Sequence, residues 1–268
     1  MSGLGKTGIW ELIRADIDRW RERRLHWVVA GIFVTVLGVT ALAFVGFSAA
    51  FSAQTTLAGF VELLTVNAAW FFFSLFALVG LFVGFPLHAH DFSRTDELGR
   101  ELIGAFCSRW LLLSVSVVAG FVVPALVGIL FFDAFSILGL LGVSILTAVT
   151  LCAYAGAGLA VVVVAQSVER VVFWLLTFYL LLAFLWESSL IPLVIGAALI
   201  GDPEGAIGTP PLVHDLLLAA SPGGAHASLS TAFVSGNFGI VGLVAAVALV
   251  GWLVVPPVLA WRRLSASE

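Results

Sequence analysis

The segment from Leu87 to Trp110, LHAHDFSRTDELGRELIGAFCSRW, holds seven formally charged residues in a chain that is only 10% charged. The sequence on either side of it is almost entirely apolar. An Arg or Asp at the centre of a membrane helix costs roughly 2.5 to 3.5 kcal/mol on the insertion scale, so this segment cannot lie in hydrocarbon. We therefore expect a water-exposed loop between two membrane spans. Its charged residues are Asp91, Arg94, Asp96, Glu97, Arg100, Glu101 and Arg109.

The composition of the whole chain is that of a polytopic membrane protein. Of its 268 residues, 61% are hydrophobic, the mean hydropathy is +1.15, and Phe alone occurs 22 times. A hydrocarbon core about 30 Å thick needs about 20 apolar residues per helical span. We predict an all-α polytopic membrane protein, a single domain over residues 1–268, with six transmembrane helices at about 27–47, 68–87, 111–131, 137–165, 171–190 and 238–261.

Two further segments depart from the plain span pattern. Residues 8–25 place Ile9, Ile13 and Ile17 at helical spacing opposite a charged face, which predicts an N-terminal amphipathic elbow helix at the membrane surface. Residues 191–237 contain apolar pieces too short to cross a bilayer, with breaks at GDPEGAIGTPP and at Ser221-Pro-Gly-Gly224. Such pieces predict a re-entrant helical excursion between spans five and six.

The distribution of charge orients the predicted spans. All twelve Lys and Arg lie before span one, in the loop 87–110, in the turn after span four, and in the C-terminal tail. By the positive-inside rule we expect both termini and the loop 87–110 to be cytoplasmic in a multi-pass protein of the cell membrane. The three loops on the other side lack Lys and Arg but carry Glu62, Asp133, Glu187, Asp202, Glu204 and Asp215.

The motifs that might support chemistry are weak. Gly5-Lys6-Thr7 lacks the earlier glycine and the preceding strand of a phosphate-binding loop, so we expect no nucleotide site in this chain. His88, His90 and Asp91 are metal-ligand types, but interfacial histidines at the end of a membrane helix are the favoured interpretation. We predict no catalytic residue, no cofactor and no resident metal.

Two features on the predicted outer side also contain functional residue types. Ser221, His214 and Asp215 are the residue types of a hydrolase triad, but adjacent His and Asp cannot easily orient one another, and no Gly-x-Ser-x-Gly elbow is present. Glu187 is the one ionisable residue that might lie at membrane depth, and such residues are functional candidates. For Glu187 a solvated helix terminus is favoured over a role in a substrate pathway or outer gate.

No predicted span has an Asp, Glu, Lys or Arg near its centre. Ion-coupled carriers usually need buried ionisable groups or broken helices at the midplane, so this pattern disfavours them. Energy for transport would then have to enter elsewhere, and the loop 87–110 is the expected place.

The order of these segments resembles the integral membrane permeases of type-2 ATP-binding-cassette (ABC) exporters. Those permeases combine an elbow helix, six spans, a charged coupling helix between spans two and three, and a re-entrant excursion between spans five and six. Glu97-Leu-Gly99, Arg100-Glu-Leu-Ile103 and Ser108-Arg109 are similar to the family's signature at the entry to span three, with Arg100 where the family has Thr. Leu218-Ala-Ala-Ser-Pro222 is similar to the Ser-Pro element before its last span.

The resemblance implies a permease that exports a hydrophobic or amphipathic substrate. Its expected partners are a separate ABC ATPase subunit, a second permease subunit that is either a copy or a paralogue, and the lipid bilayer, but no nucleic acid. The alternatives are a membrane scaffold or assembly factor, including a copper-site maturation permease, then a secondary transporter, then an intramembrane enzyme. The implied ATPase-coupling residues are Arg94, Asp96, Glu97, Arg100, Glu101 and Arg109.

Overall fold

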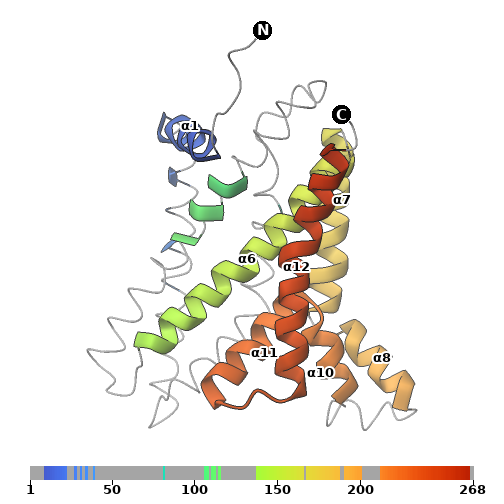
Figure 1. The fold of residues 1–268 in the computed structure, drawn as a ribbon. Helices are drawn as coiled ribbons and strands as arrows, with labels where there is room; N and C mark the ends of the chain where they lie inside the picture. Colours follow the sequence, from blue (N-terminus) through green and yellow to red (C-terminus); the bar gives the residue numbers. More distant parts are fainter. Residues whose placement is uncertain are drawn as a thin grey trace.

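A computed structural model (Figure 1) shows that the described part of the chain is almost entirely helical. The described residues are 9–22, 27–28, 31, 34–35, 39, 81, 106–108, 110–112, 114–115, 137–165, 167–187, 190–200 and 212–265. Their helices are α1 (Ile9–Glu22), α6 (Ile137–Ala165), α7 (Val168–Phe178), the π-helix η2 (Tyr179–Trp186), α8 (Leu190–Ile200), α10 (Leu212–Ala219), α11 (Pro222–Ser235) and α12 (Ile240–Ser265).

Three stretches of the described residues are long and apolar enough to cross a membrane. They are Ile145–Ala165 in α6, Glu169–Trp186 in α7 and η2, and Ile240–Arg263 in α12. They confirm the predicted membrane character and coincide with the predicted spans four, five and six. Most of the predicted spans one to three lies outside the described residues, so the count of six stays a prediction.

The segment predicted to hold short apolar pieces forms α8, α10 and α11. Helix α11 begins with Pro222 in its first turn, where proline lacks only an N–H that would have no partner within the helix. It ends at Gly236, whose φ of 67° is the left-handed conformation that glycine adopts readily at the end of a helix. The Pro and Gly breaks in the sequence therefore mark real helix boundaries.

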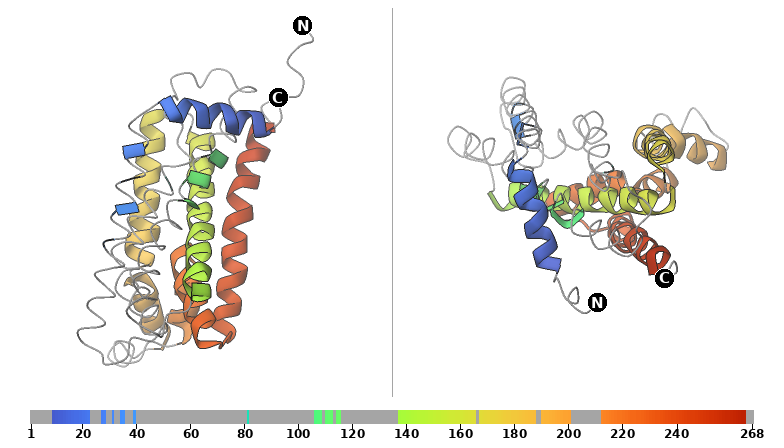
Figure 2. Two further views of the ribbon diagram at one scale, coloured as in Figure 1. Left: turned by 90° about the vertical axis from the view of Figure 1, so that its left-hand side faces the viewer. Right: turned by 90° about the horizontal axis from the view of Figure 1, so that it is seen from above.

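The long helices run side by side, and the short ones gather at their ends. Figure 2 shows α1 lying crosswise at the end of the bundle where α12 terminates. Helices α8, α10 and α11 lie at the opposite end (Figure 1). Helix α11 packs on α6 and α12, and α10 packs on α8, α11 and α12.

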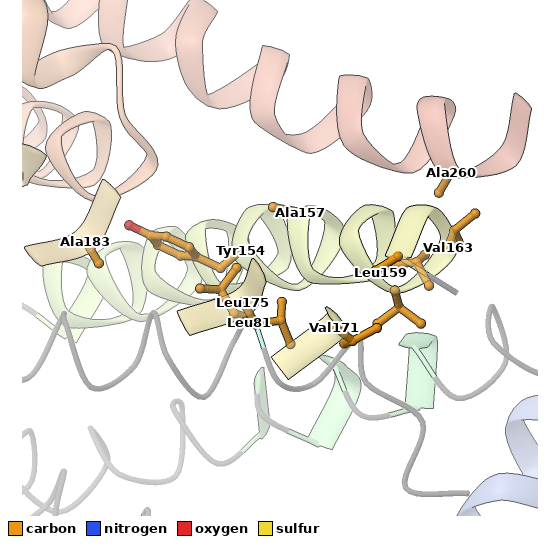
Figure 3. Close-up of a cluster of buried hydrophobic side chains, with 11 residues drawn as sticks. Leu81, Tyr154, Ala157, Leu159, Val163, Val171, Leu175, Ala183 and Ala260 are labelled. Atoms are coloured by element: carbon orange, nitrogen blue, oxygen red, sulfur yellow. The ribbon is translucent and has the colours of Figure 1, made fainter. Parts of the chain in front are cut away.

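Helix α6 is the central helix of the described part. Within its apolar window 72% of residues are buried, against 17% in α7–η2 and 22% in α12. The buried side chains of α6 meet α7, η2 and the C-terminal half of α12 in one cluster (Figure 3). The helices that flank α6 instead present much of their apolar surface outward, as membrane helices do.

Glycines on α6 let its neighbours approach closely. A Cβ built at Gly156 would lie 3.1 Å from Cγ of Pro257 on α12, and a Cβ at Gly158 would overlap the backbone of Leu81. The sequence places Gly156 in a stripe of small residues, Cys152, Gly156 and Ala160, for which packing within one subunit is the favoured interpretation. The contact with Pro257 is of that kind.

Replacing Gly158 by alanine is expected to lower stability, because the new methyl group has no room beside Leu81. Overpacking of this kind typically costs about 1 to 3 kcal/mol. The control is Gly251→Ala on α12, where a Cβ meets nothing within 4 Å. Thermal unfolding in detergent, followed by circular dichroism, should show a lower Tm for Gly158→Ala and an equal or higher Tm for Gly251→Ala. Equal stability of the two variants would contradict the close approach at Gly158.

Candidate functional site

The break between α10 and α11, residues 217–224, contains two helix ends, and the half of it that begins α11 is buried. Residues Ser221, Pro222, Gly223 and Gly224 are all buried. The last carbonyls of α10 and the first N–H groups of α11 have no partner within their own helices. Away from water each such group needs another partner, and the side chains that supply these partners define the site.

Ser221 caps the first turn of α11. Its backbone is extended (φ −90°, ψ 159°), and its hydroxyl accepts a hydrogen bond from the N–H of Gly224 at 3.1 Å. The same hydroxyl donates to the carbonyl of Leu218 at 3.0 Å. One side chain thus serves both helix ends.

Glu187 supplies the second partner for the start of α11. Its Oε1 accepts a hydrogen bond from the N–H of Gly223 at 2.7 Å. A carboxylate at this position also interacts favourably with the positive end of the helix dipole. A Cβ built at Gly223 would lie 2.5 Å from Cδ of Glu187, so only glycine allows this approach.

The same carboxylate is bound from α6. The hydroxyl of Tyr154, a residue with no exposed surface, donates a hydrogen bond to Oε1 of Glu187. Figure 3 shows Tyr154 extending from α6 toward Ala183 of η2. Glu187 therefore joins α6, the end of η2 and the start of α11, and it is not the solvated helix terminus that the sequence favours.

The π-helix sets the position of Glu187. The N–H of Glu187 bonds to the carbonyl of Leu182, five residues earlier, at 2.9 Å. A π-helix turns through a smaller angle per residue than an α-helix, so η2 changes the direction in which the residues after it point. Such segments are often found at functional sites.

Two tryptophans supply partners for the carbonyls at the end of α10. Trp186 donates from Nε1 to the carbonyl of Leu217 at 2.9 Å, and Trp252 donates from Nε1 to the carbonyl of Ala220 at 2.9 Å. Trp186 ends η2 and Trp252 lies within α12. The break is thereby fixed to both neighbouring membrane helices.

One turn farther along α11, His226 forms a second polar contact with α6. Its Nε2 lies 2.9 Å from Oγ1 of Thr147, and both residues are buried. Burial lowers the pKa of His226 to about 4, because the surroundings disfavour the charged imidazolium. His226 is therefore neutral at pH 7.

The hydrolase-triad residue types that were predicted for the outer side form two separate sets of contacts. Nδ1 of His214 lies 2.9 Å from Oδ1 of Asp215, so these adjacent residues contact one another. The hydroxyl of Ser221 is engaged by Leu218 and Gly224 as a helix cap. In the described residues no three His, Cys, Asp or Glu side chains are grouped so as to hold a metal ion.

The predicted coupling residues lie outside the described residues. This applies to Arg94, Asp96, Glu97, Arg100, Glu101 and Arg109, and also to His88 and His90. Of the predicted site residues, the structure places Glu187. Sequence reasoning did not find its partners Tyr154 and Gly223 or the donors Trp186 and Trp252. The one signal for them was the Ser-Pro-Gly-Gly break, which requires capping partners.

Taken together, the described helices and their buried polar junction define a helical membrane protein. Comparison with protein-family models gives no match to this chain, and comparison with curated protein sequences gives none either.

Replacing Glu187 by alanine should destabilise the junction, because the Tyr154 hydroxyl and the Gly223 N–H both lose their acceptor. Leaving such groups unpaired costs about 1 to 3 kcal/mol. Glu187→Gln keeps an acceptor oxygen and should cost less. The matched control is Glu169→Ala, an exposed glutamate on α7. Thermal unfolding in detergent ranks the three variants, and a Glu187→Ala chain as stable as Glu169→Ala would show that the junction does not depend on this carboxylate.

Acidification should weaken the fold through His226. An unfolded histidine titrates near 6.5, whereas the pKa of His226 is lowered to about 4. Between these values the unfolded chain binds the extra proton, so the free energy of unfolding should fall as the pH drops from about 6.5 to about 4, by up to about 3 kcal/mol. In His226→Gln this part of the pH dependence should be missing. Melts of both chains at several pH values measure the difference, and parallel pH curves would refute the assignment.

Proposed function

We propose that this chain is the transmembrane permease subunit of an ABC transporter, an exporter of a hydrophobic or amphipathic substrate driven by a separate ATPase subunit. In this proposal α1 is the elbow helix, the loop 87–110 is the coupling segment, and α8 to α11 form the extracytoplasmic re-entrant segment. Both termini are cytoplasmic, and a second permease completes the pathway.

The observation that carries the proposal is the distribution of Lys and Arg between the two predicted sides of the membrane, taken together with the order of the helices. All twelve Lys and Arg lie in segments assigned to one side, and three of them lie in the loop 87–110. Helix α1 and the C-terminal end of α12, with Arg262 and Arg263, lie at the same end of the bundle (Figure 2). The short helices lie at the other end, where a re-entrant outer segment belongs (Figure 1).

The polar junction supports a structural part of this proposal. A transporter that moves helices relative to one another needs rigid units, and hydrogen bonds that replace water at a buried helix break hold such a unit together. We assign Glu187 to the outer gate region as a fixed connection between α6 and α11. The predicted spans have no central ionisable residue, and this supports ATP as the energy source over an ion gradient.

The proposal is tested by purifying the tagged full chain from its native host in mild detergent, with and without chemical crosslinking. An ABC ATPase without membrane spans is expected to be recovered with it. Recovery of other membrane proteins in fixed ratio and no ATPase, also after crosslinking, would favour the scaffold or assembly factor instead.

Charge reversal in the loop 87–110 should uncouple the complex. Glu97→Lys with Glu101→Lys places positive charge where the resemblance puts the ATPase contact, and mismatched charges across an interface cost several kcal/mol. Transport per ATP hydrolysed should therefore fall about tenfold or more. The control is Glu169→Lys, in the other predicted cytoplasmic turn. ATPase activity and substrate flux in reconstituted vesicles measure the coupling. Unchanged coupling in the double variant, with an unchanged Tm, would count against this loop as the coupling segment.

A further inference from the structure

The carboxyl group of Glu187 is enclosed, and no Lys or Arg of the described residues lies near it. Tyr154, Ser221 and Gly223 surround the group. The described arginines belong to α1, to the start of α7 and to the end of α12, all at the end of the bundle opposite to α10 and α11 (Figures 1 and 2). A carboxylate taken out of water without a cation is costly, and such a group tends to bind a proton instead.

The other titratable groups on the elements around the junction are neither Lys nor Arg. His214 contacts Asp215, and His226 contacts Thr147 and is neutral at pH 7. Helix α8 contains no titratable side chain. The full set on the other four elements is Cys152 and Tyr154 of α6, Tyr179 of η2, His214 and Asp215 of α10, and His226 of α11.

The hydrogen bonds of the junction can accommodate one additional proton. Oε1 of Glu187 accepts from the hydroxyl of Tyr154 and from the N–H of Gly223. The carboxyl group also contacts the hydroxyl of Ser221, which donates to Leu218 and accepts from Gly224. A hydroxyl oxygen has two lone pairs, so that of Ser221 can accept one more hydrogen bond. A proton on Oε2 of Glu187 supplies this bond and leaves the others in place.

Two opposing effects bring the proton affinity of Glu187 close to neutral pH. Glu187 lies just beyond the apolar stretch Glu169–Trp186. Burial raises the pKa of Glu187 to about 7, although the hydrogen bonds from Tyr154 and Gly223 favour the ionised form. A solvated glutamate titrates near about 4.3. Between these two pH values the enclosed group keeps a proton that a solvated group would release.

We propose that Glu187 is a proton-binding site and that its bound proton strengthens the attachment of α11 to α6 and η2. The proton comes from water and binds Oε2, so no bond other than this O–H bond forms or breaks. Once ionised, the carboxylate gains by reaching water, and this requires the start of α11 to move away from it. The site needs neither ATP nor a transported substrate, so its failure would leave the proposed transport function untouched.

The sign of the pH dependence follows from the two titrations. The folded chain binds the extra proton between about pH 4.3 and about pH 7, so the contribution of Glu187 to stability is largest at the lower value and is lost as the pH rises to the upper one. His226 acts in the opposite sense over an overlapping range. Variants of Glu187 must therefore be compared with the wild-type chain at the same pH, where the effect of His226 cancels.

Infrared spectroscopy tests proton binding directly. Spectra of the full chain in a detergent without ester groups, recorded over a range of pH, detect protonated carboxyl groups by their C=O stretch. The difference between wild type and Glu187→Gln isolates Glu187, and we expect its band to disappear with a midpoint near pH 7. Glu169→Gln, at an exposed glutamate of α7, is the matched control and should leave this band in place. A Glu187 band that disappears near about pH 4.3, as for a solvated glutamate, would overturn the proposal.

Hydrogen exchange of the peptide that contains the start of α11 tests the attachment. Glutamine stays neutral at every pH and keeps an acceptor oxygen, so Glu187→Gln imitates the protonated form. Exchange in wild type relative to Glu187→Gln, measured at equal pH, should rise up to about thirtyfold between about pH 5.5 and about pH 8, because only wild type loses the proton. A ratio that stays constant over this range would refute the link between the proton and α11.

Tyr154→Phe provides a second variant in which the carboxyl group is kept. It removes one donor to Oε1, and because this hydrogen bond favours the carboxylate, the infrared midpoint should rise by about one to two pH units. The titration is read within the variant itself, so it stays decisive even if Glu187→Gln does not fold. A midpoint that is unchanged or lower in Tyr154→Phe would show that the titrating group is not the carboxyl at this junction.

Discussion

The described structure depends on hydrogen bonds at the partly buried helix break between α10 and α11. An unpaired N–H or C=O group away from water costs several kcal/mol, so the buried groups at the turn between α10 and α11 need partners. The backbone supplies some of them, from Ala220 to Leu217 and from Ser221 to Leu218, and side chains supply the others. Glu187 and Ser221 supply acceptors to the start of α11, and Trp186 and Trp252 supply donors to the end of α10. These partners come from η2 and α12 as well as from the break itself. The hydrogen bonds that pair the backbone groups of the break therefore also fix the positions of η2 and α12 relative to α10 and α11.

Close packing of α6 complements these directional contacts. In lipid, helices gain little from burying apolar surface against each other, and small residues that allow near approach take over part of that role. Gly156 receives the ring of Pro257, and Gly158 receives the backbone at Leu81. Close packing at glycines therefore stabilises the centre of the bundle, whereas hydrogen bonds stabilise the end that contains α11.

The sequence predicted the features that depend on local composition. Apolar length identified α6, α7–η2 and α12, and the Pro and Gly breaks identified α8, α10 and α11 as short helices. The π-helix was not predicted, because an apolar run such as YLLLAFLW is compatible with either helical geometry. Tyr154 lies within an apolar span, where the sequence predicts that an aromatic side chain only packs against its neighbours. No neighbouring residue in the sequence indicates that its hydroxyl faces Glu187.

Glu187 illustrates why the remaining part of the site requires the fold. Its position after an apolar span is compatible with a solvated terminus, and only the return of α11 toward α6 encloses the carboxylate. The contact between His214 and Asp215 also becomes visible only in the folded helix α10. In each case the deciding partner is fixed by backbone direction, which residue types alone do not reveal.

The two ends of α11 differ in a way that bears on movement. Its first two turns are bound by Glu187, Ser221 and the contact of His226 with Thr147, whereas its last turns border a pocket and meet α6 through Phe233 on Gly142. Directional hydrogen bonds resist displacement more than apolar contacts that can slide and repack. A displacement of α11 would therefore preserve the junction at Glu187 and change the packing around Ser230. Helix α11 is thus fixed by hydrogen bonds at its start and by apolar packing at its end.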